Sequence, residues 1–124
     1  MENLSIKGNS KTPAIDFNSD GTIRITGRSI PEDAGLFYNH LYSWIIKYCM
    51  DPMPSTKIEM ELEYMNSGSS KSILQILREL INISDNNYQV NVNWYYEIGD
   101  DDMHEKGEYF EAILKHPFNF IETY

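Results

Sequence analysis

Cysteine is nearly absent from this chain. Cys49 is the only one among 124 residues, so no disulfide can form within it. It falls inside an apolar helical pattern, and we expect a small, buried apolar side chain in the reducing cytoplasm. No apolar run approaches the roughly 18 residues that would cross a bilayer. The start, Met1 to Ser5, also lacks a basic segment followed by an apolar one. We therefore expect neither secretion nor a membrane partner.

Basic residues are also scarce. Ten Lys and Arg stand against 19 Asp and Glu, which gives a formal net charge of -9. A field of that sign opposes binding to the phosphate backbone of nucleic acid. The three histidines are scattered, and no His-Glu-x-x-His or paired-cysteine spacing occurs. The composition thus argues against nucleic acid as a partner and against a zinc site.

Several catalytic and cofactor motifs are missing too. There is no Gly-x-Ser-x-Gly elbow, and residues 66–71 lack the first glycine and the Gly-Lys-Ser/Thr ending of a Walker loop. Acidic residues cluster around Asp100, Asp101 and Asp102, but without EF-hand spacing. We interpret that cluster as the solvated first turn of a helix, where the dipole favours carboxylates. We predict a protein without enzymatic activity, cofactor or metal.

The chain contains enough hydrophobic residues to form one core. Hydrophobic residues make up 41% of the chain and aromatic residues 13%, values typical of folded globular proteins. A chain of this length buries roughly two-thirds of the surface that its unfolded form exposes. We expect one domain over residues 1–124.

The first half of the chain predicts a hairpin and a helix. Residues 14–17 and 22–26 flank an Asp-Gly turn, and residues 4–7 can add a short leading strand. Ser29 and Glu32 have the spacing of a capping box, which predicts a helix from that point to about Met50. Asp51 to Pro54 ends it.

The second half alternates strands with helices. Residues 56–64 and 88–97 alternate apolar and polar side chains, and the glutamates at 59, 61 and 63 form a stripe that we expect to be solvated and available for partner docking. Apolar periodicity predicts one helix between those strands, and another from residue 101 or 102 to about 115. A short strand is expected at 118–121. The predicted fold is α/β, a mixed sheet of four or five strands with two or three helices on one face.

The junction between residues 64 and 71 is the candidate functional site. Ser67 follows the strand and precedes the helix, and Gly68 leaves the backbone accessible to a partner enzyme. The first amides of a helix lack intrahelical partners and lie at the positive end of its dipole, so a phosphoryl group is stabilised there. Lys71, one turn on, can pair with it. Asn66 is expected to shape the turn.

Other roles for this junction stay open. Ser67 can simply cap the helix, since serine is favoured at that position. A small-anion or ligand-sensing module is a second possibility. A serine hydrolase is a weaker one, because no base for Ser67 can be identified.

Several short segments of the chain form a recognisable set: residues 27–34, 62–67, 69–71 and 94–97, with Thr12-Pro13-Ala14, Asp101-Asp102-Met103, Gly107-Glu108 and Pro117-Phe118. Taken together, these segments resemble the SiaC-type bacterial regulatory phosphoproteins, in matching order along nearly the whole chain.

The resemblance implies a STAS-like fold, similar to anti-sigma-factor antagonists, and a partner-switching role. In that family the phosphorylated residue is a threonine after Asn; here the position is Ser67, Gly68 replaces a commonly hydroxylated neighbour, and Ser69 is the nearest alternative acceptor. Ser70 belongs to the same phosphate region. The implied partners are a serine/threonine kinase related to anti-sigma factors, a PP2C-like phosphatase, and a diguanylate cyclase, or another effector, stimulated by the unphosphorylated form.

Overall fold

A single six-stranded sheet runs through the computed structural model, which describes all 124 residues. The strands follow one another in space in chain order. The elements are β1 (Leu4–Ile6), β2 (Ala14–Phe17), β3 (Thr22–Ser29), α1 (Ala34–Met50), β4 (Ser55–Met65), α2 (Ser67–Asn82), the short 3-10 helix η1 (Ile83–Asn86), β5 (Gln89–Glu97), α3 (Asp101–Leu114) and β6 (Phe118–Thr123).

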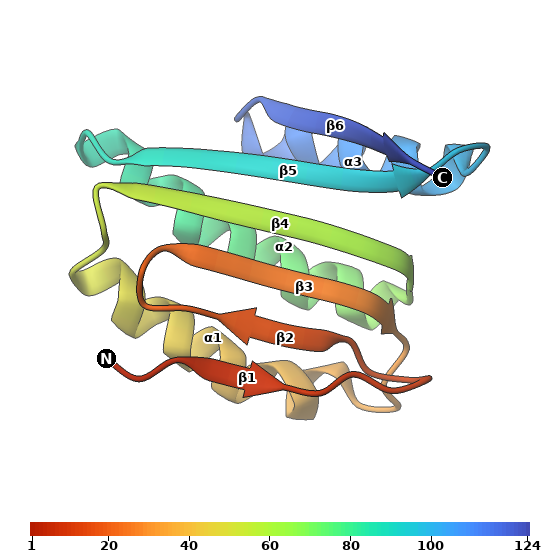
Figure 1. Cartoon of the computed structure of the whole chain (residues 1–124), viewed down its shortest axis with the longest axis horizontal. Coiled ribbons are helices and arrows are strands. Elements are labelled where there is room, and N and C mark those ends of the chain that lie inside the picture. The colour runs from red at the N-terminus through yellow and green to blue at the C-terminus, as the bar shows by residue number, and fades with distance from the viewer.

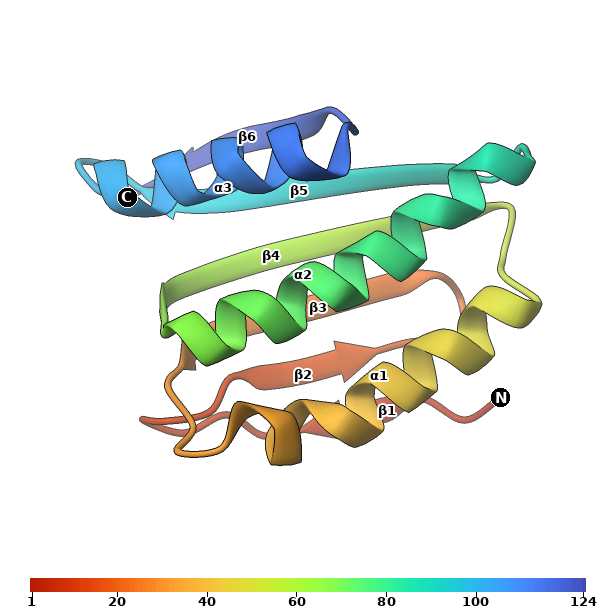
Figure 2. The ribbon, with the colours of Figure 1, turned by 180° about the vertical axis from the view of Figure 1, so that it is seen from behind.

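The sheet is mixed, as predicted, and all three α-helices cover the same face (Figures 1 and 2). β1, β2 and β3 pair antiparallel, whereas β3, β4, β5 and β6 pair parallel. Right-handed crossovers that always step in one direction place every helix on one side. The predicted count of four or five strands is too low, because both the short β1 and the terminal β6 join the sheet.

The core lies between the helices and the covered face of the sheet. Twenty-five buried hydrophobic residues form it as one cluster. The buried indole of Trp94 is also hydrogen-bonded, with its N–H donating to the carbonyl of Met103 at 3.0 Å.

No helix of this chain has the length and apolar character that a membrane crossing requires.

The predicted capping box at Ser29 is wrong. Ser29 is fully buried and ends β3, where it pairs with Met65 of β4. The helix begins five residues later, and Asp33 caps it by accepting the amide N–H of Leu36 at 3.0 Å. Sheet pairing held the backbone of Ser29 extended, and its hydroxyl found a tertiary partner instead of a helix amide.

The alternation of residues 56–64 predicts Tyr64 on the side opposite the glutamates, with the apolar residues, and that prediction is wrong too. The β3–β4 register shifts between Gly27 and Arg28, which pair with Leu62 and Tyr64. This bulge moves Met65 into the core and leaves Tyr64 with 53% of its surface exposed. An extra residue in one strand changes the face on which later side chains emerge.

Two further expectations need correction on burial. Glu59 is only 7% exposed rather than solvated; its Oε1 accepts the side-chain amide of Asn93 at 3.1 Å and lies 3.5 Å from Lys57 Nζ. Cys49, expected to be buried, is only partly so, and its thiol lies 3.6 Å from the carbonyl oxygen of Glu79.

Candidate functional site

The N-termini of the three α-helices lie at one edge of the sheet. Each helix follows a parallel strand, β3, β4 or β5, so each begins where that strand ends (Figure 2). The central one is α2, whose first residue is Ser67. The predicted junction is therefore flanked by the starts of α1 and α3.

Asn66, not Ser67, caps α2. Its Oδ1 accepts the amide N–H of Ser69 at 2.9 Å, and its side-chain amide donates to the carbonyl of Pro31 at 3.3 Å. Its backbone N–H donates to the carbonyl of Ser29 at 3.0 Å, and its carbonyl accepts from Ser70. The cap is thus bound to the segment that leads into α1.

Because Asn66 caps α2, the hydroxyl of Ser67 does not act as the helix cap. Ser67 is exposed and its hydroxyl makes no hydrogen bond with the rest of the chain, and its amide and that of Gly68 precede the helical ladder. Gly68 is also exposed, but it packs against α1, since a Cβ there would lie 3.2 Å from the Cβ of Ala34. Lys71 is exposed and in no ion pair.

Ser69 and Ser70 have different surroundings. Ser69 is fully buried, and its Oγ accepts the hydroxyl of Ser29 at 2.8 Å. The Ser29 hydroxyl lies in turn 2.6 Å from the phenolic oxygen of Tyr38. Burial raises the pKa of Tyr38 to about 12, while its hydrogen bond with Ser29 acts the other way. Ser70 is partly buried and its Oγ lacks a partner.

The charge at the three helix starts is unequal. Asp33 caps α1, and Asp100 caps α3 with Asp101 and Asp102 in its first turn. The cap of α2 is the neutral Asn66, and no acidic residue lies in its first turn. The positive dipole end of α2 is therefore not compensated by a carboxylate of its own helix.

The three histidines contact other residues or are exposed. The ring of His116 bonds the carbonyl oxygen of Val90, and that of His104 stacks on Tyr96. His40 is exposed on α1. None makes a hydrogen bond with Ser67, so the hydroxyl has no bound base.

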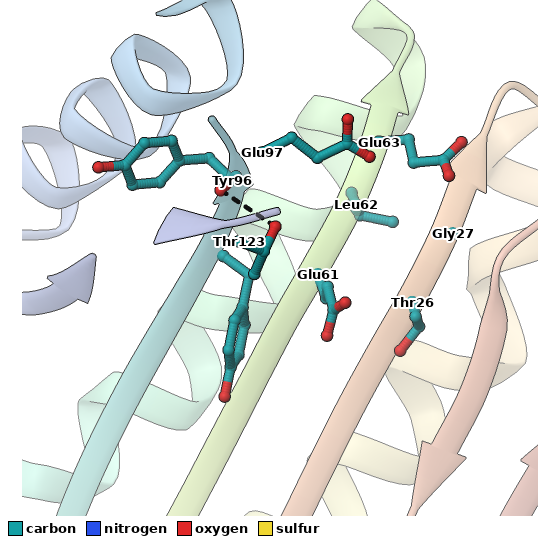
Figure 3. Close-up of a pocket in the computed structure, with 9 residues that line it drawn as sticks. Thr26, Gly27, Glu61, Leu62, Glu63, Tyr96, Glu97 and Thr123 are labelled. Carbon is teal, nitrogen blue, oxygen red and sulfur yellow. Dashed lines mark hydrogen bonds between the residues drawn. The ribbon is translucent and has the colours of Figure 1, made fainter. Parts of the chain in front are cut away.

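A separate small hollow of about 100 Å³ lies on the open face of the sheet, between β3, β4 and β5. Figure 3 shows its carboxylates, Glu61 and Glu63 from β4 and Glu97 from β5, together with Thr26 and Thr123. Thr123 donates to the carbonyl of Tyr96 at 3.3 Å, and Arg24 lies 3.5 Å from Glu61. Tyr95 also lines this hollow, and its interaction with the nearby Glu59 carboxylate raises the pKa of Tyr95.

The sequence predictions for the junction omitted Ser29 and Tyr38, which hold it in place. A signal for Ser29 was present: it continues the spacing of the core-facing Ile23 and Ile25, where a polar residue is unusual. Such a buried hydroxyl needs a partner. Which partner it takes depended on the packing of α1 and α2.

Comparison with known proteins places this geometry in a family. The model of the SiaC family regulatory phosphoprotein matches residues 6–123. An uncharacterised protein of Pseudomonas aeruginosa strain UCBPP-PA14 is 26% identical over 119 residues, covering 95% of this chain and 94% of that protein.

Solved structures agree. The SiaC structure of Pseudomonas aeruginosa superposes with a TM-score of 0.88 at 25% identity, covering 99% of this chain and 100% of that one. The same organism's diguanylate cyclase SiaD has been solved in complex with its activator SiaC; that chain matches with a TM-score of 0.86, 25% identity and coverage of 97% and 99%. With the family model spanning nearly all of its length, the chain belongs to the SiaC family of regulatory phosphoproteins.

Proposed function

We propose that this chain is a non-enzymatic switch whose phosphorylation on Ser67 controls its binding to a diguanylate cyclase. One observation carries the proposal: Ser67 is the exposed hydroxyl at the one helix start of this edge that has no carboxylate. A phosphate there meets free amides and the positive end of the α2 dipole.

The same geometry favours Ser67 over the alternative acceptor, Ser69. A kinase must reach the hydroxyl and bring a phosphate to it. Ser69 is fully buried and its oxygen accepts a hydrogen bond from Ser29, so modification would require opening the contact between β3 and α2. Lys71, exposed one turn beyond Ser67, supplies a cation within the same helix.

The switch acts at a closely packed point of the surface. Gly68 is exposed and carries no side chain, so a partner backbone can approach the start of α2. A phosphate adds about 1.5 to 2 negative charges and a tightly hydrated group. We infer that its bulk and its desolvation cost expel a partner that fits the unmodified surface.

The proposed partners follow the family and the activator complex of the Pseudomonas protein. A serine/threonine kinase adds the phosphate, a PP2C-like phosphatase removes it, and the unphosphorylated form binds a diguanylate cyclase and so supports c-di-GMP signalling in biofilm formation. We place this exchange in the cytoplasm, where the free Cys49 stays reduced.

Peptide-mapped mass spectrometry of the protein from its native cells is the first test. Phosphate is expected on Ser67 and absent from Ser69. Ser67→Ala should abolish labelling by the cognate kinase, and Ser67→Thr should retain it. Equal labelling of the alanine variant and the wild type would refute the assignment.

Binding to the diguanylate cyclase is the second test. Ser67→Asp should weaken the complex at least tenfold, while Ser67→Asn, which is similar in size and uncharged, should weaken it less. If the aspartate variant binds as tightly as the wild type, charge at this position does not control the complex. Calorimetry with phosphate and nucleotides separates the alternative, an anion-sensing module, because only that role requires direct binding of such ligands.

A further inference from the structure

A groove of about 710 Å³ lies between the end of β4 and α3, next to the junction but distinct from it. We refer to it as the β4–α3 groove. Its lining residues are Glu63, Tyr64, Met65, Asp100, Asp102, Met103, Glu105, Lys106 and Tyr109.

The groove has an apolar floor and aromatic walls. Met65 and Met103 are buried, with 1% and 5% of their surfaces exposed, whereas Tyr64 and Tyr109 are 53% and 63% exposed. Tyrosines are enriched at protein interfaces, because a rigid ring buries much area at low entropic cost while its hydroxyl keeps a polar partner. Two of them around methionines form a surface suited to apolar side chains.

A deviation in the sheet creates this surface. The β3–β4 register shift turns Tyr64 out of the position that regular alternation would give it. Bulges are found where a strand redirects a side chain. The outward Tyr64 is what gives the groove its wall on the β4 side.

The rim is acidic. Glu63, Asp100, Asp102 and Glu105 stand against the single cation Lys106, and none of these residues forms an ion pair. One oxygen of Asp100 is occupied, since it accepts the amide N–H of Met103 at 3.1 Å. An occupant with acidic side chains would be repelled, and one with lysines or arginines would be attracted.

We infer that the β4–α3 groove binds a cationic amphipathic segment of a partner protein. The apolar side chains of this segment lie between Tyr64 and Tyr109, and its Lys and Arg side chains contact the acidic rim. The inference rests on the proposed function in one respect: we assign the segment to the effector that Ser67 controls. Met65 lies only two residues before Ser67, so we place an uncharged, apolar part of the segment, not its Lys and Arg side chains, against the start of α2, where the bulk and desolvation cost of a phosphate exclude it.

Two synthetic 18-residue helical peptides test the chemistry, one of Leu and Lys and one of Leu and Glu in the same pattern. Titrated into the isotopically labelled protein, the Leu/Lys peptide should shift the amide resonances of the groove residues, and the Leu/Glu peptide should not. Shifts spread evenly over the acidic surface of the protein, or equal shifts from both peptides, would overturn the inference.

Matched variants separate the groove from the overall charge. Tyr109→Ala and Glu105→Lys, both at exposed positions of α3, should each weaken peptide binding about tenfold or more. Asp85→Lys makes the same charge change at η1, beyond the far end of α2, and should weaken it less than threefold (Figure 2). Equal losses for Glu105→Lys and Asp85→Lys would mean that only net charge matters.

The diguanylate cyclase from the same organism then separates the two proposals. If Tyr109→Ala and Glu105→Lys lose cyclase binding while their Ser67 is still labelled, the groove is the docking surface. If both bind the cyclase normally and only Ser67→Asp fails, the groove inference is wrong and the proposed function stands. If the groove variants fail and Ser67→Asp binds normally, the proposed function is wrong and the groove stands.

Discussion

The hydroxyl oxygens of Ser29 and Ser69 lie 2.8 Å apart in the interior, although 40 residues separate them in the chain. This bond joins the end of β3 to the first turn of α2, and Tyr38 extends it to α1. It fixes the helix start that carries Ser67 against two other elements.

The bond predicts strong coupling between the two serines. Ser29→Ala should lower the free energy of unfolding by about 1 to 3 kcal/mol, because it removes the hydrogen-bond partner of both the Ser69 and the Tyr38 hydroxyl. Ser69→Ala should cost less, about 1 kcal/mol, because the Ser29 hydroxyl keeps its bond to Tyr38. The double variant should lose clearly less than the sum. Urea unfolding measures all three, and strict additivity would show that the two hydroxyls do not interact.

The cap of α2 predicts a smaller loss. Asn66→Ala removes the acceptor for the Ser69 amide and should lower the free energy of unfolding by about 1 kcal/mol. Asn66→Asp keeps an oxygen in the same place and should lose little or nothing. Thermal unfolding of the two variants compares them. Equal losses of stability in the two variants would show that the important contact of Asn66 is the hydrogen bond from its side-chain amide to the carbonyl of Pro31, not the helix cap.

Two helical glycines should respond oppositely to alanine. A Cβ at Gly107 would lie 2.6 Å from the ring of Trp94 and 2.7 Å from that of Phe120, so Gly107→Ala should destabilise by about 1 to 3 kcal/mol. At Gly35 the nearest atom is 3.4 Å away. Gly35→Ala should therefore be neutral or stabilising by up to about 1 kcal/mol, from helix propensity alone. Denaturant unfolding measures the free energy of unfolding of both variants. Similar changes for Gly107→Ala and Gly35→Ala would contradict the crowding at Trp94.

The raised pKa of Tyr38 predicts that the folded protein loses stability at alkaline pH. Burial raises its pKa to about 12 in the folded protein, against about 10 when unfolded. The unfolded chain loses this proton first, so the contribution is complete below pH 10 and disappears as the pH rises to about 12. Unfolding free energies from pH 8 to 12 measure it.

Cys49 titrates in an overlapping range, since burial first and Glu79 second raise its pKa to about 11. The comparison is therefore made in a Cys49→Ala background. There, Tyr38→Phe should flatten the decline between pH 10 and 12, although it lowers stability throughout by removing the bond to Ser29. An unchanged slope would assign the decline to other groups.

The same thiol predicts slow chemical modification. With its pKa near 11, Cys49 carries little thiolate at pH 8, and its alkylation by iodoacetamide should be roughly 100-fold slower than that of an unperturbed cysteine. The protein unfolded in urea serves as the control and should react at the ordinary rate. Equal rates before and after unfolding would show that the thiol is freely accessible in the native state.

The chain itself determined which segments become helices and strands. Strict alternation before Met65 specifies β4, and apolar residues at three- and four-residue steps specify α2, because these periods decide which faces can be buried together. The hairpin, the third helix at Asp101 and the placement of the helices on one face were also predicted correctly. The exposed Ser67 beside Gly68 follows from the same local pattern.

Tertiary structure decided what local patterns cannot express. Ser29 has the spacing of a capping residue, yet pairing with Met65 keeps it in β3 and gives its hydroxyl to Ser69. Tyr64 has the spacing of a core residue, yet one shift in strand register turns it outward. Both outcomes depend on partners that lie far away in the chain. The periodicity of the sequence therefore determined that Ser67 lies at the junction of β4 and α2. The tertiary packing determined which residues surround it and that its hydroxyl forms no hydrogen bond within the chain.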